Sequence, residues 1–410
     1  MKHSDIAVFI GNTLDHFDSS LYFFLAPVMA PIFFPNTDPI VQLILAYSIL
    51  ITALITKPLG AIIFGTIASR KGAVFSLSYS LIGVAITSVL IGCVPSYKSI
   101  GYMAPFGLII MTILREIFAS GESAVAKLYV LTNKSSSSAL TSSCFYNISS
   151  ILGMILASIA ATVAINNSPT NIWRVCFWLG GSVGFVGVFL RRYFPADNVT
   201  YQHDQITKNI QLKSLWEYKA KVLKIALVTG FGYITYSVPF IFFNSFVPII
   251  TDISLHSMFM LNNFLLIFDL IVLFIAGRLV INYQPSKILL CSSLVLFVTI
   301  IPLFLILKNS SLLVVTIVRL WIIFWGAVFA IPANVWCEKL LLDLPEKYFL
   351  MSIGASLGTG IIGKTTTAVS LYLWYKTNYI FVPATYIAIL MAITFAVIAI
   401  NINNNHKTNL

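Results

Sequence analysis

Long apolar runs separated by short polar segments make up almost the whole chain. An α-helix needs about 20 mostly apolar residues to cross a bilayer, and these runs are long enough to do so. The pattern therefore predicts an all-α integral membrane protein with about twelve transmembrane helices. The expected spans are 6–34, 41–68, 75–94, 102–131, 141–165, 173–193, 223–252, 258–281, 287–307, 312–340, 349–375 and 380–402.

The stretch 195–224 is the one long polar interruption and the one credible linker. It divides the chain into an N-terminal six-helix half (1–194), a cytoplasmic linker (195–224) and a C-terminal six-helix half (225–410). Two six-helix halves around a site near the middle of the membrane are typical of transporters that work by alternating access. The helix count alone does not establish that function.

Basic residues are distributed unevenly between the two sides of the membrane. With the N-terminus inside and the connections alternating, the outer segments hold Lys98, Lys308 and Lys376. Many more lie in the inner segments, among them Lys2, Arg70, Lys71, Lys134, Arg191, Arg192, Lys208, Lys213, Lys219, Lys221, Lys224, Lys287, Lys339, Lys347 and Lys407. Cytoplasmic loops carry the excess of Lys and Arg, so we expect a multi-pass protein of the cell inner (plasma) membrane with both termini in the cytoplasm.

Composition agrees with a membrane protein and narrows its chemistry. The chain is 58% hydrophobic and 10% charged, with a mean hydropathy of +0.92, values outside the range of soluble domains. The net charge of +11 does not indicate nucleic-acid binding, because the basic residues are spread over short loops.

The five cysteines show no paired spacing, so we expect no disulfide, metal site or cofactor. Residues 1–5 precede an apolar run too long for a signal peptide, so we expect no cleaved leader.

The first span contains two carboxylates, Asp15 and Asp18, with His16 beside them. A charged side chain inside a bilayer costs a few kcal/mol even on the mildest scale, and such residues usually face a protein interior or a water-filled cavity. Three residues apart on a helix, the two acids share one face. Asp15 and Asp18 are therefore candidate proton- or cation-coupling sites. The alternative is that both lie near the cytoplasmic end and are simply hydrated.

The fourth span places Thr112, Arg115, Ala119 and Glu122 on one face at helical spacing. Opposite charges held about two turns apart could accommodate a zwitterion, with the substrate carboxylate on Arg115. Glu122 becomes a third coupling candidate. The alternative is that Arg115 and Glu116 only pair with neighbouring helices.

Two further groups of residues in the C-terminal half carry candidate chemistry. Asp269 and Arg319 have opposite charges at similar depth in their spans, and we interpret them as a buried charge pair. Tyr233, Tyr236, Phe240 and Phe243 recur on one side of the seventh span. They could form an aromatic cage for a quaternary ammonium group, with Tyr233 and Tyr236 as candidate substrate-binding residues, although such stripes more often serve helix packing.

The segment Gly358–Thr365 fits the phosphate-loop pattern of nucleotide-hydrolysing proteins. That loop works only between a strand and a helix, whereas this segment lies inside an apolar run. We therefore reject an ATP-driven enzyme and expect no catalytic residue. Lys364 is interpreted instead as a cavity residue that attracts a carboxylate or pairs with an acid.

The N-terminal half carries a series of short motifs in a fixed order. They are Gly11-Asn12 followed by Leu14-Asp15-His16-Phe17-Asp18 and Leu21-Tyr22, Phe33–Pro35 with Asp38-Pro39, Lys57–Gly60, Ile91–Gly101 with Ala104-Pro105, Gly121-Glu122, and Trp173-Arg174 before Leu190-Arg191. Together these motifs resemble the metabolite:proton symporter family of the major facilitator superfamily. The C-terminal half is similar in layout only.

The resemblance implies a major facilitator fold and solute uptake coupled to protons, with proline and betaine as leading candidate substrates. It places Asp15 where the family usually has Glu, and Asp18 and Glu122 on acidic positions of the family. It also implies a charged latch in the loop after the second span. Here Ser69, Ala73 and Val74 stand at the acidic and basic positions of that latch.

The sequence thus favours a monomeric, proton-coupled symporter of a small zwitterionic or anionic metabolite. Its partners are that substrate, protons and the lipid bilayer. The altered latch keeps an alternative open, namely an uncoupled facilitator or a diverged membrane paralogue that does not transport.

Overall fold

The computed structural model describes residues 3–35, 37–71, 73–131, 136–166, 171–193, 214–280, 283–342, 344 and 346–408. Within these ranges the regular structure is helical throughout and contains no strand. The predicted linker lies outside the described residues up to 213. Helix α10 begins at Lys219, inside the stretch predicted as linker.

The segment before the linker contains eight helices and one 3₁₀ turn among its described residues. These are α1 (His3–Phe33), α2 (Pro39–Ser48), η1 (Ile49–Thr52), α3 (Ala53–Lys71), α4 (Ala73–Cys93), α5 (Tyr97–Ile100), α6 (Met103–Leu131), α7 (Ser136–Asn166) and α8 (Ile172–Tyr193). Helices α2, η1 and α3 follow one another without a break, so they form one span that bends at η1.

After the linker the structure describes another series of long helices. These are α10 (Lys219–Ser237), η2 (Val238–Phe242), α11 (Phe243–Ile250), α12 (Leu255–Val280), α13 (Pro285–Leu305), α14 (Leu312–Lys339), α15 (Lys347–Leu357), η3 (Gly358–Lys364), α16 (Thr365–Thr377) and α17 (Phe381–Thr408). The segments η2 and η3 are π-helical turns inside otherwise continuous spans. Wider turns of this kind often occur at functional sites.

The twelve predicted spans correspond to twelve helical segments of membrane-crossing length, which confirms the predicted fold class. Nine of them are long and apolar enough to cross a membrane by length and composition, among the residues that the structure describes. Helix α1 is not among the nine, and it carries Asp15, His16 and Asp18. The strongest polar exceptions in the hydrophobic pattern therefore lie in the part of the fold that also forms the site.

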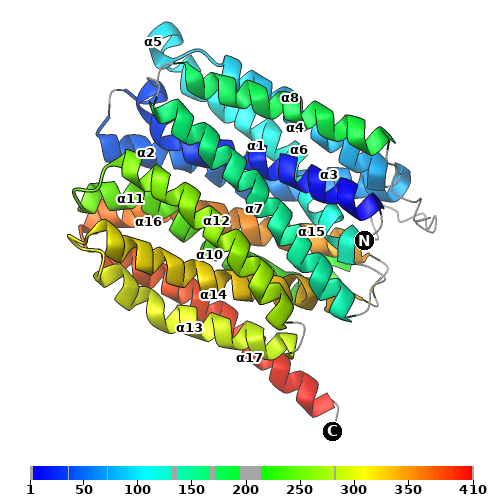
Figure 1. Cartoon of the computed structure of the whole chain (residues 1–410). Helices are drawn as coiled ribbons and strands as arrows, with labels where there is room; N and C mark the ends of the chain where they lie inside the picture. Colours follow the sequence, from blue (N-terminus) through cyan, green and yellow to red (C-terminus); the bar gives the residue numbers. More distant parts are fainter. Residues whose placement is uncertain are drawn as a thin grey trace.

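The long helices run roughly side by side in one bundle (Figure 1). Helices α1, α4, α6 and α8 lie on one side of it, and α13, α14 and α17 lie on the other. Helix α7 packs against both α1 and α12, and α15 packs against α3, so these pairs join the two sides. The free ends of α1 and α17 lie at the same end of the bundle, which we call the terminal end; the other is the loop end.

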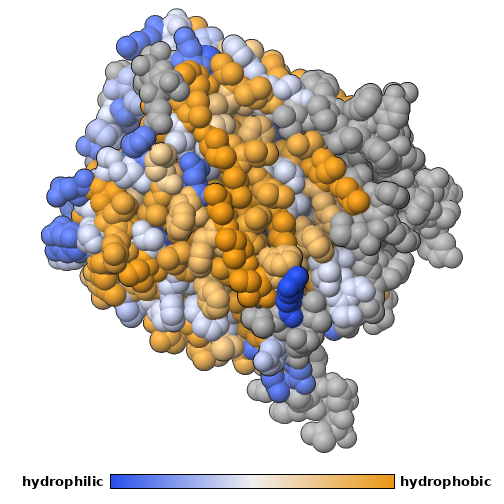
Figure 2. All heavy atoms as spheres, viewed as in Figure 1, coloured by the Kyte–Doolittle hydropathy of each residue, from blue (hydrophilic) through white to orange (hydrophobic). Residues whose placement is uncertain are grey.

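Apolar side chains cover much of the outer surface of the bundle (Figure 2). Exposed examples are Ile55, Phe264, Val298 and Leu313, each at least 60% accessible. Side chains of this type on the outside of a long helical bundle suit contact with lipid.

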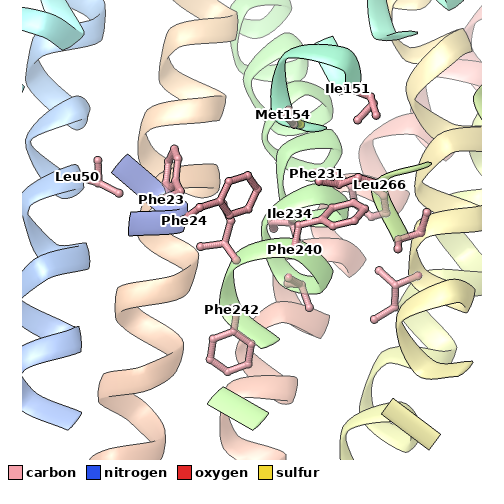
Figure 3. Close-up of a cluster of buried hydrophobic side chains, with 14 of the residues drawn as sticks. Phe23, Phe24, Leu50, Ile151, Met154, Phe231, Ile234, Phe240, Phe242 and Leu266 are labelled. Atoms are coloured by element: carbon pink, nitrogen blue, oxygen red, sulfur yellow. The ribbon is translucent and has the colours of Figure 1, made fainter. Parts of the chain in front are cut away.

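Aromatic side chains pack together in the interior at the loop end, and Figure 3 shows one of them, Phe242, among other buried hydrophobic side chains. Phe242 stacks on Phe246 with ring centroids 4.7 Å apart, and Phe243 packs on Phe304 at 5.1 Å. These four rings are fully buried. The contact between Tyr47 of α2 and Ser245 of α11, 2.8 Å between their hydroxyl oxygens, lies beside this cluster and joins the two sides of the bundle.

Candidate functional site

A cavity of about 250 Å³ lies in the middle of the bundle, between helices from both sides. It extends from the centre toward the terminal end, where Asn147, Asn334 and Met351 line it. The aromatic cluster fills the loop end. The wall of the cavity also contains polar and charged side chains, namely Asp15, His16, Ser19, Ser20, Lys57, Glu116, Asp269 and Lys364.

Asp18 and Arg115 form a buried ion pair next to this cavity. The guanidinium Nη2 and Nε lie 2.6 and 2.7 Å from Oδ2 of Asp18. The hydroxyl of Ser88 on α4 donates to the other carboxylate oxygen. Both charged side chains are almost completely buried, so removing one would leave the other charge without compensation.

Several cationic side chains lie near the carboxylate of Glu116. Its Oε1 accepts from Nζ of Lys364 at 2.5 Å and from Nη1 of Arg115 at 3.2 Å. Lys57 lies within electrostatic range of the same carboxylate, and its Nζ donates to Thr359 at 3.2 Å. Lys364 and Thr359 belong to η3, whereas Glu116 and Lys57 belong to α6 and α3, so both contacts cross between the two sides of the bundle.

Formal charges balance among the residues of this central cluster. The acids are Asp15, Asp18 and Glu116, and the cations are Lys57, Arg115 and Lys364. A balanced set reduces the cost of placing so many charges in a low-dielectric interior, because each charge is opposed nearby.

Asp15 and His16 are the two ionisable residues of α1 among the described residues that line the cavity. The Asp15 Oδ2 atom lies 3.9 Å from Nδ1 of His16, and that nitrogen lies 3.0 Å from the carbonyl oxygen of Asn12. Asp15 is 6% exposed and Asp18 is 2% exposed, so protein buries most of both side chains. This burial favours the interpretation of Asp15 and Asp18 as an acidic face inside the protein over the alternative in which both are simply hydrated near the cytoplasmic end.

Four aromatic rings form a continuous row along the cavity. The ring centroids of Phe23 and Tyr233 are 6.3 Å apart, those of Tyr233 and Tyr236 5.8 Å, and those of Tyr236 and Phe240 5.5 Å. All four side chains line the cavity. Figure 3 shows Phe23 and Phe240 within the buried cluster, on α1 and η2. Phe243, the fourth member of the predicted stripe, packs with Phe304 instead.

The predicted pair of Asp269 and Arg319 is not formed. Nη2 of Arg319 donates to the Asn262 side-chain oxygen at 2.5 Å, and no ion pair joins Arg319 to Asp269 among the described residues. Asn262 precedes Asp269 by about two turns of α12. Arg319 therefore contacts the helix that contains Asp269, as predicted, but about two turns away from Asp269 itself. Asp269 faces the cavity instead.

The other predicted site residues, Lys364, Arg115 and Glu122, differ in whether the structure places them at the cavity. Lys364 lines the cavity and pairs with an acid, as one of its two interpretations required. Arg115, predicted to bind substrate, pairs with Asp18 and Glu116 and is not among the cavity-lining side chains that the structure describes. The side chain of Glu122 lies outside the described residues.

Two residues of the site, Glu116 and Lys57, were not predicted from the sequence. Glu116 was considered only as a packing partner, because it lies beside the stripe that contains Arg115. Lys57 entered the sequence analysis only as the first residue of the Lys57–Gly60 motif. The rule that intramembrane ionisable residues are functional by default would have selected both.

The glycines of the phosphate-loop pattern serve helix packing. A Cβ atom on Gly363 would lie 2.5 Å from the Tyr233 ring, and one on Gly358 would meet the Ala226 carbonyl and Thr229 of α10. The segment is a helical turn inside a span, without the strand that a phosphate loop requires. Its glycines allow η3 to approach α10 closely.

Comparison with known proteins finds proline/betaine transporters among the relatives of this chain. No family model matches the chain. It is 26% identical over 208 residues to the proline/betaine transporter of Escherichia coli K12, which is 50% of this chain and 42% of that protein. It is 26% identical over the same shares to the glycine betaine/proline/ectoine/pipecolic acid transporter OusA of Dickeya dadantii. A putative proline/betaine transporter of Staphylococcus haemolyticus is 29% identical over 55% of this chain and 50% of its own length. The matched segment thus spans about half the length of these curated relatives.

Solved structures resemble the whole chain. A D-xylose-proton symporter superposes with a TM-score of 0.73 at 14% identity, over 97% of this chain and 96% of its own. The xylose transporter XylE of E. coli, in a partially occluded inward-open conformation, gives 0.72 at 14% identity over 96% of each chain. The major facilitator transporter FucP, in the outward conformation, gives 0.68 at 15% identity over 97% of this chain and 99% of its own. These similarities confirm the major facilitator fold.

Proposed function

We propose that this relative of proline/betaine transporters, built on the major facilitator fold, imports a small zwitterionic or anionic metabolite together with protons. Proline and betaine are the leading candidates because they appear in the names of the relatives. The observation that carries the proposal is the charged cluster in the wall of a cavity between the two sides of the bundle. At about 250 Å³ the cavity is smaller than the roughly 300–1,000 Å³ typical of drug-sized ligands, which favours a small substrate.

The cavity offers cations to a substrate carboxylate. Lys57 and Lys364 both line it, and Lys364 is already paired with a carboxylate, that of Glu116. A substrate carboxylate is chemically equivalent to Glu116, so it competes for the same ammonium group. Because the pair joins the two sides of the bundle, this exchange links substrate binding to the contact between them.

Coupling requires a carboxylate that is protonated in one state and ionised in another. Asp15 is the coupling candidate of α1 that faces the cavity, so protons reach it through the same opening as substrate. Asp18 is held by Arg115 and Ser88 in this structure and is not among the described residues that line the cavity. Glu122 stays a candidate from the sequence.

The deciding experiment is uptake of labelled proline, glycine betaine and a panel of small acids into proteoliposomes. We expect accumulation under an inward proton gradient and its loss when the gradient is collapsed. Asp15→Asn should abolish accumulation but keep exchange of substrate across the membrane, whereas Asp252→Asn, on an exposed loop residue, should behave as wild type.

Two results would contradict proton-coupled symport. Equilibration without accumulation in the wild type identifies an uncoupled facilitator. Failure of every solute to move, with the protein folded, identifies a paralogue that does not transport these compounds.

We also propose a plasma-membrane monomer with cytoplasmic termini, so that the terminal end of the bundle faces the cytoplasm. A reporter fused after Leu410 that is active only in the cytoplasm should give a signal. A signal only from a periplasmic or extracellular reporter would reverse the orientation.

A further inference from the structure

We propose that Asp269 binds the substituted ammonium group of the substrate, at one end of the aromatic row that lines the cavity. The inference deepens the proposed function and rests on it, because it names the chemistry that selects the substrate. It also assigns a role to the C-terminal half, where the sequence motifs give no guidance.

Asp269 differs from the acids of the central cluster in its contacts. Asp18 and Glu116 are both held by cations at short range. The carboxylate of Asp269 has no hydrogen bond or ion pair among the described residues, although it is only 6% exposed. A buried carboxylate without a cation is costly, so a ligand cation that enters the cavity would find a strong partner there.

The surroundings of Asp269 suit a bulky, weakly hydrated cation. Asp269 lies within electrostatic range of Tyr236, the third ring of the row. Phe240 packs against Tyr236 and lines the same cavity, as do the apolar residues Leu273 and Ile323. Aromatic faces attract quaternary ammonium groups, and apolar neighbours accommodate their methyl groups better than they accommodate a hydrated ammonium.

The two ends of the aromatic row carry opposite charges. Nζ of Lys364 lies 5.5 Å from the centroid of the Phe23 ring, at the end of the row away from Phe240. Asp269 lines the same cavity and lies within electrostatic range of Tyr236, toward the other end of the row. A substrate that lies along the row with its carboxylate toward Lys364 therefore places its ammonium group toward Asp269.

The formal charges of the cavity favour the same class of ligand. The central cluster is balanced, so Asp269 in its ionised form adds one negative charge to it when His16 is neutral. The site should therefore accept zwitterions with a substituted ammonium group and small organic cations. It should reject an isosteric anion that lacks the ammonium group.

The test is direct binding to the purified detergent-solubilised protein, measured by competition, with three probes of matched shape. These are glycine betaine, the anion 3,3-dimethylbutyrate, in which carbon replaces the nitrogen, and the cation tetramethylammonium. We expect the wild type to prefer glycine betaine over 3,3-dimethylbutyrate by about tenfold or more, the range of one hydrogen-bonded or paired charge. Asp269→Asn should reduce this preference to roughly threefold or less and abolish tetramethylammonium binding.

Asp252→Asn is the matched control, because Asp252 lies in the exposed loop that precedes α12. It should keep the wild-type preference. Asp269→Glu, which keeps the charge, should retain tetramethylammonium binding even if the longer side chain weakens it. A thermal melt of each variant shows whether it is folded.

Two outcomes would overturn the proposal. One is an unchanged preference in folded Asp269→Asn. The other is normal binding of all probes by Asp269→Asn with loss of proton-driven accumulation, which would make Asp269 a proton carrier. Binding of tetramethylammonium needs no transport, so failure of proton-coupled uptake would leave this result interpretable.

Discussion

The role of each charged side chain at the centre of the bundle depends on the residues with which it is paired. Arg115 was predicted to meet a substrate carboxylate, but Asp18 and Glu116 occupy its guanidinium in the structure. In contrast, Asp269 was predicted to pair with Arg319 and instead faces the cavity. At this scale, the main functional information is therefore which acids are paired with cations of the protein and which can still bind a ligand.

Removal of the Asp18 charge should destabilise the protein. Asp18→Leu leaves Arg115 buried with only one remaining acid partner, and breaking a buried pair in this way costs about 3–5 kcal/mol. The double variant Asp18→Leu with Arg115→Met should be more stable than the single variant, because no charge is left uncompensated. Thermal unfolding of the purified proteins measures both, and a double variant that melts below the single one would contradict the role assigned to the pair.

The sequence allowed several site residues to be predicted, but not their pairing. Asp15, Lys364, Tyr233 and Tyr236 line the cavity, and an ionisable or aromatic residue inside a span was enough to select them. Helical spacing shows which residues share a face of one helix. It does not show which helices meet at that level, so it could not predict the contact between Glu116 and Lys364.

At the scale of helices, the hydrophobic pattern located all twelve spans, with the largest differences at the start of α7, Ser136 against the predicted 141, and at the end of α17, Thr408 against the predicted 402. The π-helical turns η2 and η3 could not be predicted, because they depend on packing between spans. Both contribute to the cavity wall, through Phe240 in η2 and Lys364 in η3. The irregular turns thus occur where the two sides of the bundle present functional side chains.

Close packing of η3 on α10 should tolerate no added methyl group at Gly358. Gly358→Ala would overlap the Ala226 carbonyl and Thr229, and overpacking of this kind costs about 1–3 kcal/mol. Gly107→Ala is the control, since the nearest atom to its Cβ, on Val94, would be 3.6 Å away, an ordinary contact. Thermal unfolding should place Gly358→Ala below the wild type and Gly107→Ala at or above it. Equal melting of the two variants would show that η3 can move away from α10 at little cost.

At the scale of the whole molecule, contacts between the two sides of the bundle define the present conformation. The Glu116–Lys364 pair lies at the centre, and the Tyr47–Ser245 hydrogen bond lies at the loop end. The cavity is lined toward the terminal end by Asn147, Asn334 and Met351, whereas aromatic rings pack against one another at the loop end. Alternating access requires contacts at the loop end to open when the cavity closes at the terminal end.

Loss of the Tyr47 hydroxyl should favour opening of the loop end. A hydrogen bond contributes about 0.5–1.5 kcal/mol, so Tyr47→Phe should raise the open population relative to the closed one by roughly two- to tenfold. Spin labels at Tyr102→Cys and Tyr379→Cys, two exposed loop-end positions, report the change as longer distances after the native cysteines are replaced.

Tyr22→Phe is the matched control for this measurement. Its hydroxyl donates to the Ala46 carbonyl at 2.9 Å, a contact between α1 and α2 on one side of the bundle. It should leave the distance distribution as in the wild type. Equal distributions for Tyr47→Phe and Tyr22→Phe would exclude the Tyr47–Ser245 contact as part of the closure.

The charge balance of the central cluster has an electrical consequence. Moving one net elementary charge through the membrane potential involves about 2.3 kcal/mol per 100 mV, whereas a set of three acids and three cations that moves as a unit carries no net charge. While the Glu116–Lys364 pair holds the six charges together, the cluster adds no voltage dependence of its own. Any current that accompanies transport would come from the proton and the substrate, so a zwitterion carried with one proton would bring one positive charge into the cell in each cycle.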